Sequence, residues 1–527
     1  MKRVLALAAL VAVVLHSGAA MAAAAEMPKR GGTLAFAVVA EPPNYDCHAN
    51  ASFAVAHTVA PHYSTLLKLD GRGYPKLIGD LATSWSVGPD GLTYTFRLHE
   101  GVKFHDGSAL TSTDVKATYE RIADPPAGVV SVRKAWYADI LAIETPDPAT
   151  VVFKLKAPNA SMPLSFASPF GCIYSAARLE QNPRYPETEV MGSGAFTFVR
   201  HAKGASWEGK RFEGYFRKGL PYLDGYKAYF VTSGGVLPGI LGGRFDAEFR
   251  GRNQQERDRL LAKMRDQLIV DEGPWVGGLM VTFNTRRKPF DDIRVRRALS
   301  LAIDRWAGAE TLSRISILEQ VGGFMRPGFA MALPPAELVK LPGFSRDIDK
   351  SRAEAKRLLK EAGAESLSFK LFNRGVAEPY TAAGVYLIDQ WRRIGVNVQQ
   401  EQLETKPYED GLQKGNFDVA IESISDFVDD PTAQFSRLLT QTASPTGFSG
   451  HADAKLDDMY ERQRHELDPE ERIRLVRDID RYAIGIAYNV PLLWYRRIVV
   501  LHKKIRNWHF SPSQYILQDL SEVWLDQ

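Results

Sequence analysis

The stretch KLIGDLATSWSVGPDGLTYTFRLHEGVKFHDGSALTSTDVKATYERI, residues 76–122, contains two strand patterns followed by the beginning of a helix. The first strand ends at residues 88–91, GPDG, a turn in which Pro and Gly set the backbone angles. Residues 92–98 alternate between apolar and polar side chains, as a half-buried strand does. Thr111 and Asp114 have the spacing of a helix cap and the third helical residue. The stretch therefore predicts a β-hairpin that leads into a helix.

The same residues, above all LATSWSVGPDGLTYTFRLHEGVKFHDGSALTSTDV, closely resemble the signature of the extracellular solute-binding proteins of the peptide/nickel class, family 5. Members of this family are the ligand-capturing components of bacterial ABC importers. Further words that resemble the family are GGTL (31–34), EPPNYD (41–46), PYLDG (221–225) and LGGRFDA (241–247). Two small departures are Ala195 in place of a Pro and Phe216 in place of a Trp.

The resemblance implies an α/β fold: a two-lobe periplasmic binding protein with hinge crossover strands and an extra subdomain in the first lobe. From residue 351 onward, helix and strand patterns alternate, which favours α/β sheets with helix-covered faces. The expected parts are a signal peptide (1–25), the first part of lobe I (26–66), the extra subdomain (67–189), the second part of lobe I (190–280), lobe II (281–493) and the C-terminal return to lobe I (494–527).

The N-terminus has the pattern of a cleavable secretory signal. Lys2 and Arg3 precede an apolar run over residues 4–15, and Ala20-Met21-Ala22 fits a signal-peptidase site. The run is shorter than the roughly twenty residues that span a bilayer, so an N-terminal anchor is the less favoured alternative. No Cys follows the run closely, which argues against a lipid anchor. We expect a periplasmic protein.

Charge and cysteine content narrow the partners and the compartment. The formal net charge falls from +4 to +2 when Lys2 and Arg3 leave with the signal, so neither nucleic acid nor an anionic membrane is an expected partner. Cys47 and Cys172 are the two cysteines. In an oxidising compartment they form either a disulfide or two buried thiols, and spacing along the chain does not decide between these.

No familiar catalytic or metal-binding motif occurs in the sequence. Ser193 has Met191 where the first glycine of a G-x-S-x-G nucleophile elbow would stand, and Ser206 has Glu208 where the last would stand. His99-Glu100 has its next histidine at His105, too late for an H-E-x-x-H site. The eleven histidines are scattered. We therefore expect no catalytic residue, no cofactor and no metal, with a secreted hydrolase of unrecognised active site as the alternative.

The resemblance also implies candidate ligand residues. In dipeptide- and oligopeptide-binding relatives, an Asp four residues before a Pro pairs with the α-ammonium of the ligand. Before Pro431 that position is Phe427, which is itself a candidate ligand residue, and Asp426 lies one residue earlier, so Asp426 is the first acidic candidate. Asp429 and Asp430 follow it. The alternative for all three acidic residues is turn and cap chemistry before a helix.

Arg374 stands where the dipeptide-binding relative has its carboxylate-binding Arg, seventeen residues before Trp391. A guanidinium group suits bidentate carboxylate recognition, whereas the alternative is a solvated Arg at a strand end. Four aromatic residues are candidates for the walls of the cleft, although each could be an ordinary core residue. They are Phe53, Trp275, Trp494 and Tyr495.

These observations predict a monomeric binding protein whose two lobes close on a peptide or a similar small solute. The resemblance implies delivery of that solute to an inner-membrane ABC permease complex. Nickel chelates, opines and oligosaccharides are alternative ligands within the family. A chemoreceptor-coupled or chaperone-like binding protein would share the fold and the cleft.

Overall fold

A sheet of eleven strands runs through the molecule in the computed structural model, which describes residues 27–424 and 426–527. Its path is β15 (Asn397–Leu403), β14 (Ser368–Arg374), β16 (Val419–Ser423), β12 (Leu268–Phe283), β17 (Asn489–His502), β11 (Ala247–Glu248), β1 (Thr33–Val38), β10 (Gly225–Phe230), β9 (Ser206–Arg211) and β8 (Phe196–Ala202), with β13 (Leu318–Gln320) paired to β17. The predicted signal peptide, residues 1–25, lies outside the described residues. The chain has the mixed α/β class that the sequence predicts.

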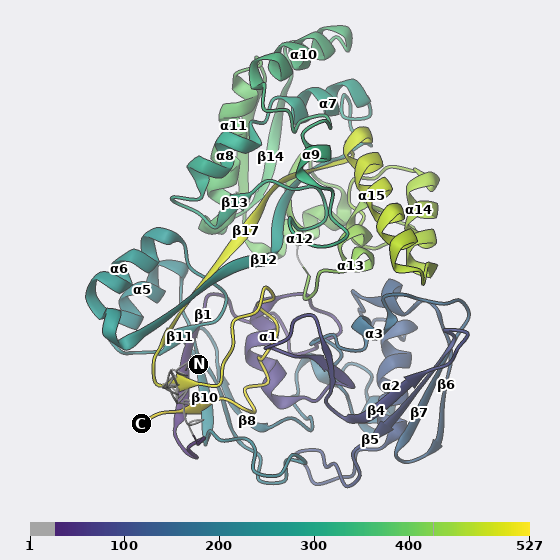
Figure 1. Ribbon diagram of the computed structural model, residues 1–527, viewed down its shortest axis with the longest axis vertical. Helices are drawn as coiled ribbons and strands as arrows, with labels where there is room; N and C mark the ends of the chain where they lie inside the picture. Colours follow the sequence, from purple (N-terminus) through teal and green to yellow (C-terminus); the bar gives the residue numbers. More distant parts are fainter. Residues whose placement is uncertain (1–26, 425) are drawn as a thin grey trace, which may run out of the picture.

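The two lobes lie one above the other in Figure 1, and β12 and β17 run between them. These two strands pair antiparallel with each other, from Leu268 opposite His502 to Thr282 opposite Asn489. The register shifts on both sides of Gly278, so the ladder is interrupted where the strands pass between the lobes. The predicted lobe boundaries at 280/281 and 493/494 fall inside these strands. The crossover is therefore one paired ribbon.

Lobe I is built around β1, which pairs in parallel with both β10 and β11. Along β1, Phe36 and Val38 enter the large core of this lobe, whereas Ala37 points to the opposite face. That face is covered by α5 (Ser233–Leu241) and α6 (Gln254–Met264). The lobe also contains α1 (Phe53–Val59) and the short pair β18 (Ile505–Arg506) and β19 (Trp524–Leu525).

The extra subdomain contains the hairpin and helix that residues 76–122 predict. Its antiparallel sheet has the order β4 (Ala82–Val87), β5 (Thr93–Leu98), β7 (Thr150–Leu155) and β6 (Ile140–Asp147). Thr111 and Asp114 form the predicted capping box of α2 (Ser112–Ala123), with the Thr111 N–H donating to Asp114 Oδ2 over 2.8 Å. The hairpin and the helix start are confirmed. Smaller elements are β2 (Leu67–Leu69), β3 (Leu77–Gly79), α3 (Met162–Ser165) and α4 (Ala176–Gln181).

Lobe II covers its part of the sheet with helices on both sides. They are α7 (Ile293–Leu301), α8 (Arg305–Leu312), α9 (Pro335–Leu338), α10 (Ile348–Glu361), α11 (Ala382–Arg392), α12 (Thr405–Lys414), α13 (Pro431–Phe435), α14 (Ala454–His465) and α15 (Pro469–Ile486). Asp468 caps α15 by accepting the Glu471 N–H over 2.8 Å, as the sequence predicts. One apolar core surrounds Trp391, and a second surrounds Trp494.

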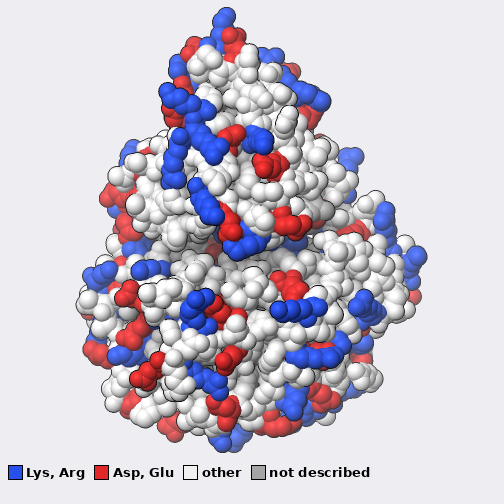
Figure 2. Space-filling model, turned by 180° about the vertical axis from the view of Figure 1, so that it is seen from behind, with Lys and Arg blue, Asp and Glu red and all other residues white. Residues whose placement is uncertain are grey.

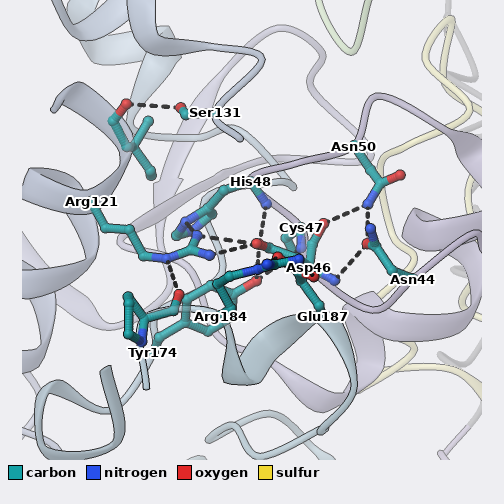
Figure 3. Close-up of polar contacts among 12 residues, drawn as sticks. Asn44, Asp46, Cys47, His48, Asn50, Arg121, Ser131, Tyr174, Arg184 and Glu187 are labelled. Carbon is teal, nitrogen blue, oxygen red and sulfur yellow. Dashed lines mark hydrogen bonds and ion pairs between the residues drawn. The ribbon is translucent and has the colours of Figure 1, made fainter. Parts of the chain in front are cut away.

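A disulfide and a buried ion pair fasten the loop after β1 to the extra subdomain. Figure 3 shows the polar contacts around the ion pair. Cys47 is bonded to Cys172, so of the two alternatives for these residues the structure shows the disulfide. Arg121 pairs with Asp46 over 2.6 Å. Burial lowers the pKa of His48 to about 3, so its neutral ring can accept a hydrogen bond from Arg121 over 2.7 Å. The loop is thereby held at two adjacent points.

Lobe II also touches the extra subdomain directly, where α13 and α14 lie beside α3 in Figure 1. Tyr74 accepts the N–H of Asp429 over 2.8 Å and donates to its carboxylate over 3.1 Å. Asp139 pairs with Arg464 over 3.3 Å. We call this the subdomain contact, made by Tyr74, Trp136, Asp139 and Ser161 with Phe427, Asp429, Asp430, Arg464 and Arg472. The lobes are therefore joined at two places, the strand crossing and this contact.

Candidate functional site

Three of the predicted aromatic residues meet at the strand crossing. Trp275 on β12 and Tyr495 on β17 lie edge to face, with ring centroids 5.4 Å apart. Phe53, the first residue of α1, joins them through Arg250. The guanidinium carbon of Arg250 lies 4.9 Å from the Phe53 ring centroid and 5.6 Å from that of Trp275. We call Phe53, Arg250, Trp275 and Tyr495 the aromatic cluster.

The backbone around Arg250 is held by its neighbours. The buried carboxylate of Glu248 accepts the N–H groups of Arg250 and Gly251 over 2.9 and 3.1 Å, and it pairs with Arg252 over 2.7 Å. Arg497 donates to the carbonyl oxygen of Arg250 over 2.9 Å. Sequence reasoning missed Arg250. The one available signal was its place three residues after the word LGGRFDA.

Arg374 lies at the end of β14, near the aromatic cluster but outside it. Its Nε donates to Thr405 Oγ1 over 2.9 Å, and its guanidinium carbon is 5.7 Å from the ring centroid of Tyr380. Burial raises the pKa of Tyr495 well above its ordinary value; Tyr380 adds to this rise, whereas Arg250 opposes it. Tyr495 therefore interacts with groups on both sides, and Tyr380 links Arg374 to the cluster.

Glu378 is the acidic side chain that faces Arg250 from lobe II. It lies in a short turn of helix, Ala377–Thr381, where its Oε1 accepts the Ser316 hydroxyl over 2.5 Å and the Ile317 N–H over 3.0 Å. Burial raises the pKa of Glu378, and the charge of Arg250 opposes that rise. Glu378 is thus held by hydrogen bonds within its own lobe, while the positive charge of Arg250 in the other lobe acts on its carboxylate.

Asp426 has a partner within the chain. Arg133 of the extra subdomain lies 3.8 Å from its Oδ1, and the Phe427 N–H donates to the same oxygen over 2.7 Å. Burial raises the pKa of Asp426, whereas Arg133 and Arg437 lower it. Two guanidinium groups therefore already act on the carboxylate that we expected to meet a ligand ammonium. A role of Asp426 toward a ligand stays a prediction.

The other residues of that segment have structural partners. Phe427 is fully buried and packs on Trp136, with ring centroids 5.6 Å apart. Asp429 pairs with Arg326 over 2.8 Å. Asp430 caps α13 by accepting the Thr432 N–H over 2.9 Å, which is the cap chemistry considered as the alternative. These three side chains belong to the subdomain contact.

Trp494 lies on the opposite face of β17 from Tyr495. Its Nε1 donates to the carbonyl oxygen of Gly323 over 2.9 Å, and its ring packs in the second core of lobe II. Successive side chains of a strand point to opposite faces, so Trp494 and Tyr495 cannot both face the crossing. The structure places Trp494 in the second core of lobe II, whereas Tyr495 and Trp275 pack at the edge of the core that contains Trp391.

The molecular surface is indented between the lobes on the face shown in Figure 2, and both basic and acidic side chains lie along the indentation. Within residues 27–424 and 426–527, no helix combines the length and apolar character that a membrane span needs. In the same part of the chain, no three His, Cys, Asp or Glu side chains gather in a way that could hold a metal ion.

A separate cavity of about 60 Å³ lies inside lobe I, next to the disulfide. It is lined by Lys68, Asp519 and Tyr515 among others, and Lys68 pairs with Asp519 over 2.7 Å. Ligand pockets are typically about 300–1,000 Å³, so this space suits water. We do not assign it to a ligand.

Comparison with known proteins adds to this geometry. The glutathione-binding protein GsiB of Pectobacterium atrosepticum is 32% identical over 261 residues, which are 50% of this chain and 49% of GsiB. The chain thus spans about half the length of the curated relatives it matches. The periplasmic binding protein DppA of Helicobacter pylori, solved with the peptide STSA, superposes with a TM-score of 0.83 at 22% identity, covering 95% of this chain and 99% of DppA. AgaA of A. tumefaciens R10, solved with agropinic acid, superposes with a TM-score of 0.83 at 22% identity, covering 94% of this chain and 99% of AgaA.

The two solved structures show the fold alone, and they confirm the α/β architecture expected from the sequence. The family comparison goes further. The model of the bacterial extracellular solute-binding proteins, family 5 Middle, matches residues 76–446, which is more than half of the chain and includes the opening stretch. Together with the two lobes and the cluster at their crossing, this match identifies the chain as a member of the bacterial extracellular solute-binding proteins, family 5.

Proposed function

We propose that this protein is the substrate-binding component of an ABC importer. It captures a small peptide or a similar solute in the periplasm as a monomer and delivers it to an inner-membrane permease complex. It has no catalytic role and no nucleic-acid partner. The observation that carries the proposal is the aromatic cluster, in which Phe53 and Arg250 of lobe I meet Trp275 and Tyr495 of the two crossover strands. A ligand bound there is enclosed when the lobes close.

Family membership supports this function, and the names of the similar proteins indicate a ligand class. GsiB is named as a glutathione-binding protein, DppA was solved with a tetrapeptide, and AgaA with agropinic acid. Each of these ligands carries at least one carboxylate. Arg374, whose position suggested a carboxylate ligand, has its Nε bonded to Thr405 and its planar end beside Tyr380. We propose that Arg374 binds a ligand carboxylate.

A binding assay tests the proposal. The mature protein is unfolded, refolded without ligand, and titrated calorimetrically with glutathione, dipeptides, tetrapeptides and opines. Arg374→Ala should weaken the tightest ligand by about 2–5 kcal/mol, because it removes one half of a buried charge pair. The control is Arg392→Ala on the exposed end of α11. Absence of saturable binding to every solute of the panel would contradict the function, and unchanged affinity in Arg374→Ala would contradict the assignment.

A further inference from the structure

We propose that Arg250 is a second anion anchor of the interlobe site, so that the preferred ligand is a small acidic peptide-like solute with two carboxylates. The inference rests on the proposed function, because it assumes that a ligand binds at the strand crossing. It adds a specificity-determining residue, since two guanidinium anchors select against solutes with a single carboxylate.

The charge of Arg250 is not balanced by a neighbouring side chain. Among the described residues, no carboxylate oxygen lies within 4.0 Å of its guanidinium nitrogens. Glu248, the acidic residue nearest in sequence, is committed to Arg252 and to backbone N–H groups. The Nε of Arg250 is buried and has no hydrogen-bond acceptor in this part of the chain. Arg250 is half-buried, and a partly buried cation whose Nε lacks an acceptor is unfavourable unless water or an arriving ligand supplies one.

Other buried arginines of this protein are supplied with acceptors. Arg305 donates to the carbonyl oxygens of Pro491 and Gly343 over 2.7 and 2.6 Å. Arg497 donates to backbone carbonyls of residues 511 and 513. Arg133, Arg296 and Arg464 share an unsatisfied Nε with Arg250, but their terminal nitrogens donate to backbone carbonyl oxygens. Among the described residues, the guanidinium of Arg250 has no such acceptor, and it lies where the two lobes meet.

The rings beside Arg250 favour recognition of an anion. Phe53 and Trp275 hold the guanidinium by cation–π contacts at 4.9 and 5.6 Å, which fixes its plane without using its N–H groups. A planar guanidinium with free N–H groups can bind a carboxylate through two parallel hydrogen bonds. The buried setting strengthens such a bond, because water competes less.

The competing explanation is that Arg250 exists to attract Glu378 during closure. Glu378 faces Arg250 from lobe II, and each affects the other's charge. However, Glu378 Oε1 accepts two hydrogen bonds on its own lobe, from Ser316 and Ile317, and it does not reach ion-pair distance. Under the proposal, Arg250 and Arg374 supply the two cations that meet the ligand. A solute with two carboxylates and one ammonium group complements this arrangement.

The test compares glutathione with its glycine amide, which lacks one carboxylate, on refolded protein by calorimetry. Wild type should prefer glutathione. Arg250→Gln should weaken glutathione by roughly 30-fold or more while leaving the amide nearly unchanged. The glutathione affinity of Arg250→Lys should lie between those of wild type and Arg250→Gln, because lysine keeps the charge and loses the two-pronged geometry of the guanidinium. The matched control is Arg244→Gln, an exposed arginine 4.9 Å from the ring of Tyr229 and outside the site.

Two results would overturn the role of Arg250. One is a loss below threefold for glutathione in Arg250→Gln; the other is an equal loss for glutathione and the amide, which would indicate an effect on site shape. A loss reproduced by Glu378→Gln would support the competing explanation instead. If wild type binds neither peptide, the peptide function fails, and the comparison moves to an iminodiacid opine and its monoamide. If the protein then binds the opine and its monoamide equally well, or binds neither of them, the inference about Arg250 is overturned.

Discussion

The two places where the lobes meet treat their charged side chains in opposite ways. The buried acids of the subdomain contact all have a guanidinium partner: Asp139 with Arg464, Asp429 with Arg326 and Asp430 with Arg472. Arg250 at the strand crossing and Arg374 near it have no carboxylate oxygen within 4.0 Å among the described residues. Both side chains are half-buried, where an unpaired charge is unfavourable, so under our proposal the chain completes the first region and a ligand completes the second.

This comparison distinguishes two properties of lobe closure: the stability of the closed arrangement and the choice of ligand. Substitutions in the subdomain contact should change the stability of the closed arrangement with little effect on which solute is preferred. Substitutions at the crossing should change affinity and selectivity with little effect on stability. Each of the following predictions tests one side of this division.

The largest effect is expected for Arg472→Leu. Arg472 reaches Asp430, Gln463 and the hydroxyl of Ser161, so its loss leaves a buried carboxylate without a cation. The free energy of unfolding should fall by about 3–5 kcal/mol, measured by urea denaturation. The matched control is Arg474→Leu, two residues along the same helix with an exposed side chain. A loss below about 1 kcal/mol would show that pairing in this contact is not what stabilises it.

A buried acid outside the subdomain contact should titrate differently from the paired ones. Burial raises the pKa of Glu422 on β16 from its ordinary value to about 7. Between about pH 4.5 and 7 the folded state then holds a proton that the unfolded state has lost, so stability falls as the pH rises through this range. Glu422→Gln should remove that fall. The difference in free energy of unfolding between the variant and wild type should therefore grow by about 2 kcal/mol in favour of the variant as the pH rises from 5 to 8. Glu365→Gln, on an exposed position, is the control, and parallel pH profiles for Glu422→Gln and wild type would contradict the prediction.

Asp426 lies between the two regions and can be assigned by one substitution. Asp426→Asn keeps the shape of the side chain and removes the charge beside Arg133. If its role is to balance Arg133, the free energy of unfolding without ligand should fall by about 1–3 kcal/mol. The control is Asp410→Asn on the exposed face of α12. Unchanged stability, with weaker binding only of ligands that carry a free amino group, would assign Asp426 to the ligand.

The smallest effect is expected for Tyr74→Phe, which removes one hydroxyl from the subdomain contact. Its bonds to Asp429 exist only when the lobes are together, so the loss of about 1 kcal/mol should weaken every ligand several-fold without changing their order. Tyr482→Phe is the control, because its bond to Asp453 over 2.9 Å lies within lobe II. A change of ligand order in Tyr74→Phe would break the division between closure and selectivity.

Local structure was well predicted where the signal was local. The capping box of α2 and the cap of α15 depend on residues three positions apart, and both form as expected. The resemblance carried the larger architecture, including the return of the chain through β17. It also suggested Phe53, Trp275, Trp494 and Tyr495 as candidates near the cleft, of which the first two and Tyr495 lie in the aromatic cluster and Trp494 does not.

The remaining site residues depend on contacts between distant segments. Arg250 follows a two-residue strand, and nothing near it in sequence distinguishes a ligand anchor from a surface arginine. Asp426 owes its environment to Arg133, which lies far earlier in the chain. The sequence could not decide which of Trp494 and Tyr495 points toward the crossing. Strand β17 is buried on both faces, so no alternation of polar and apolar residues shows which side chains share a face.

The disulfide has a consequence for the chemistry of the cargo. Cys47 and Cys172 are the only cysteines in the sequence, they are bonded to each other, and their exposed fractions are 2% and 1%. Thiol–disulfide exchange needs an attacking thiolate and an accessible sulfur, and this chain offers neither to a bound solute. If the ligand is a thiol-bearing peptide, as the proposed function allows, we therefore expect the protein to bind and release it without exchange with this disulfide.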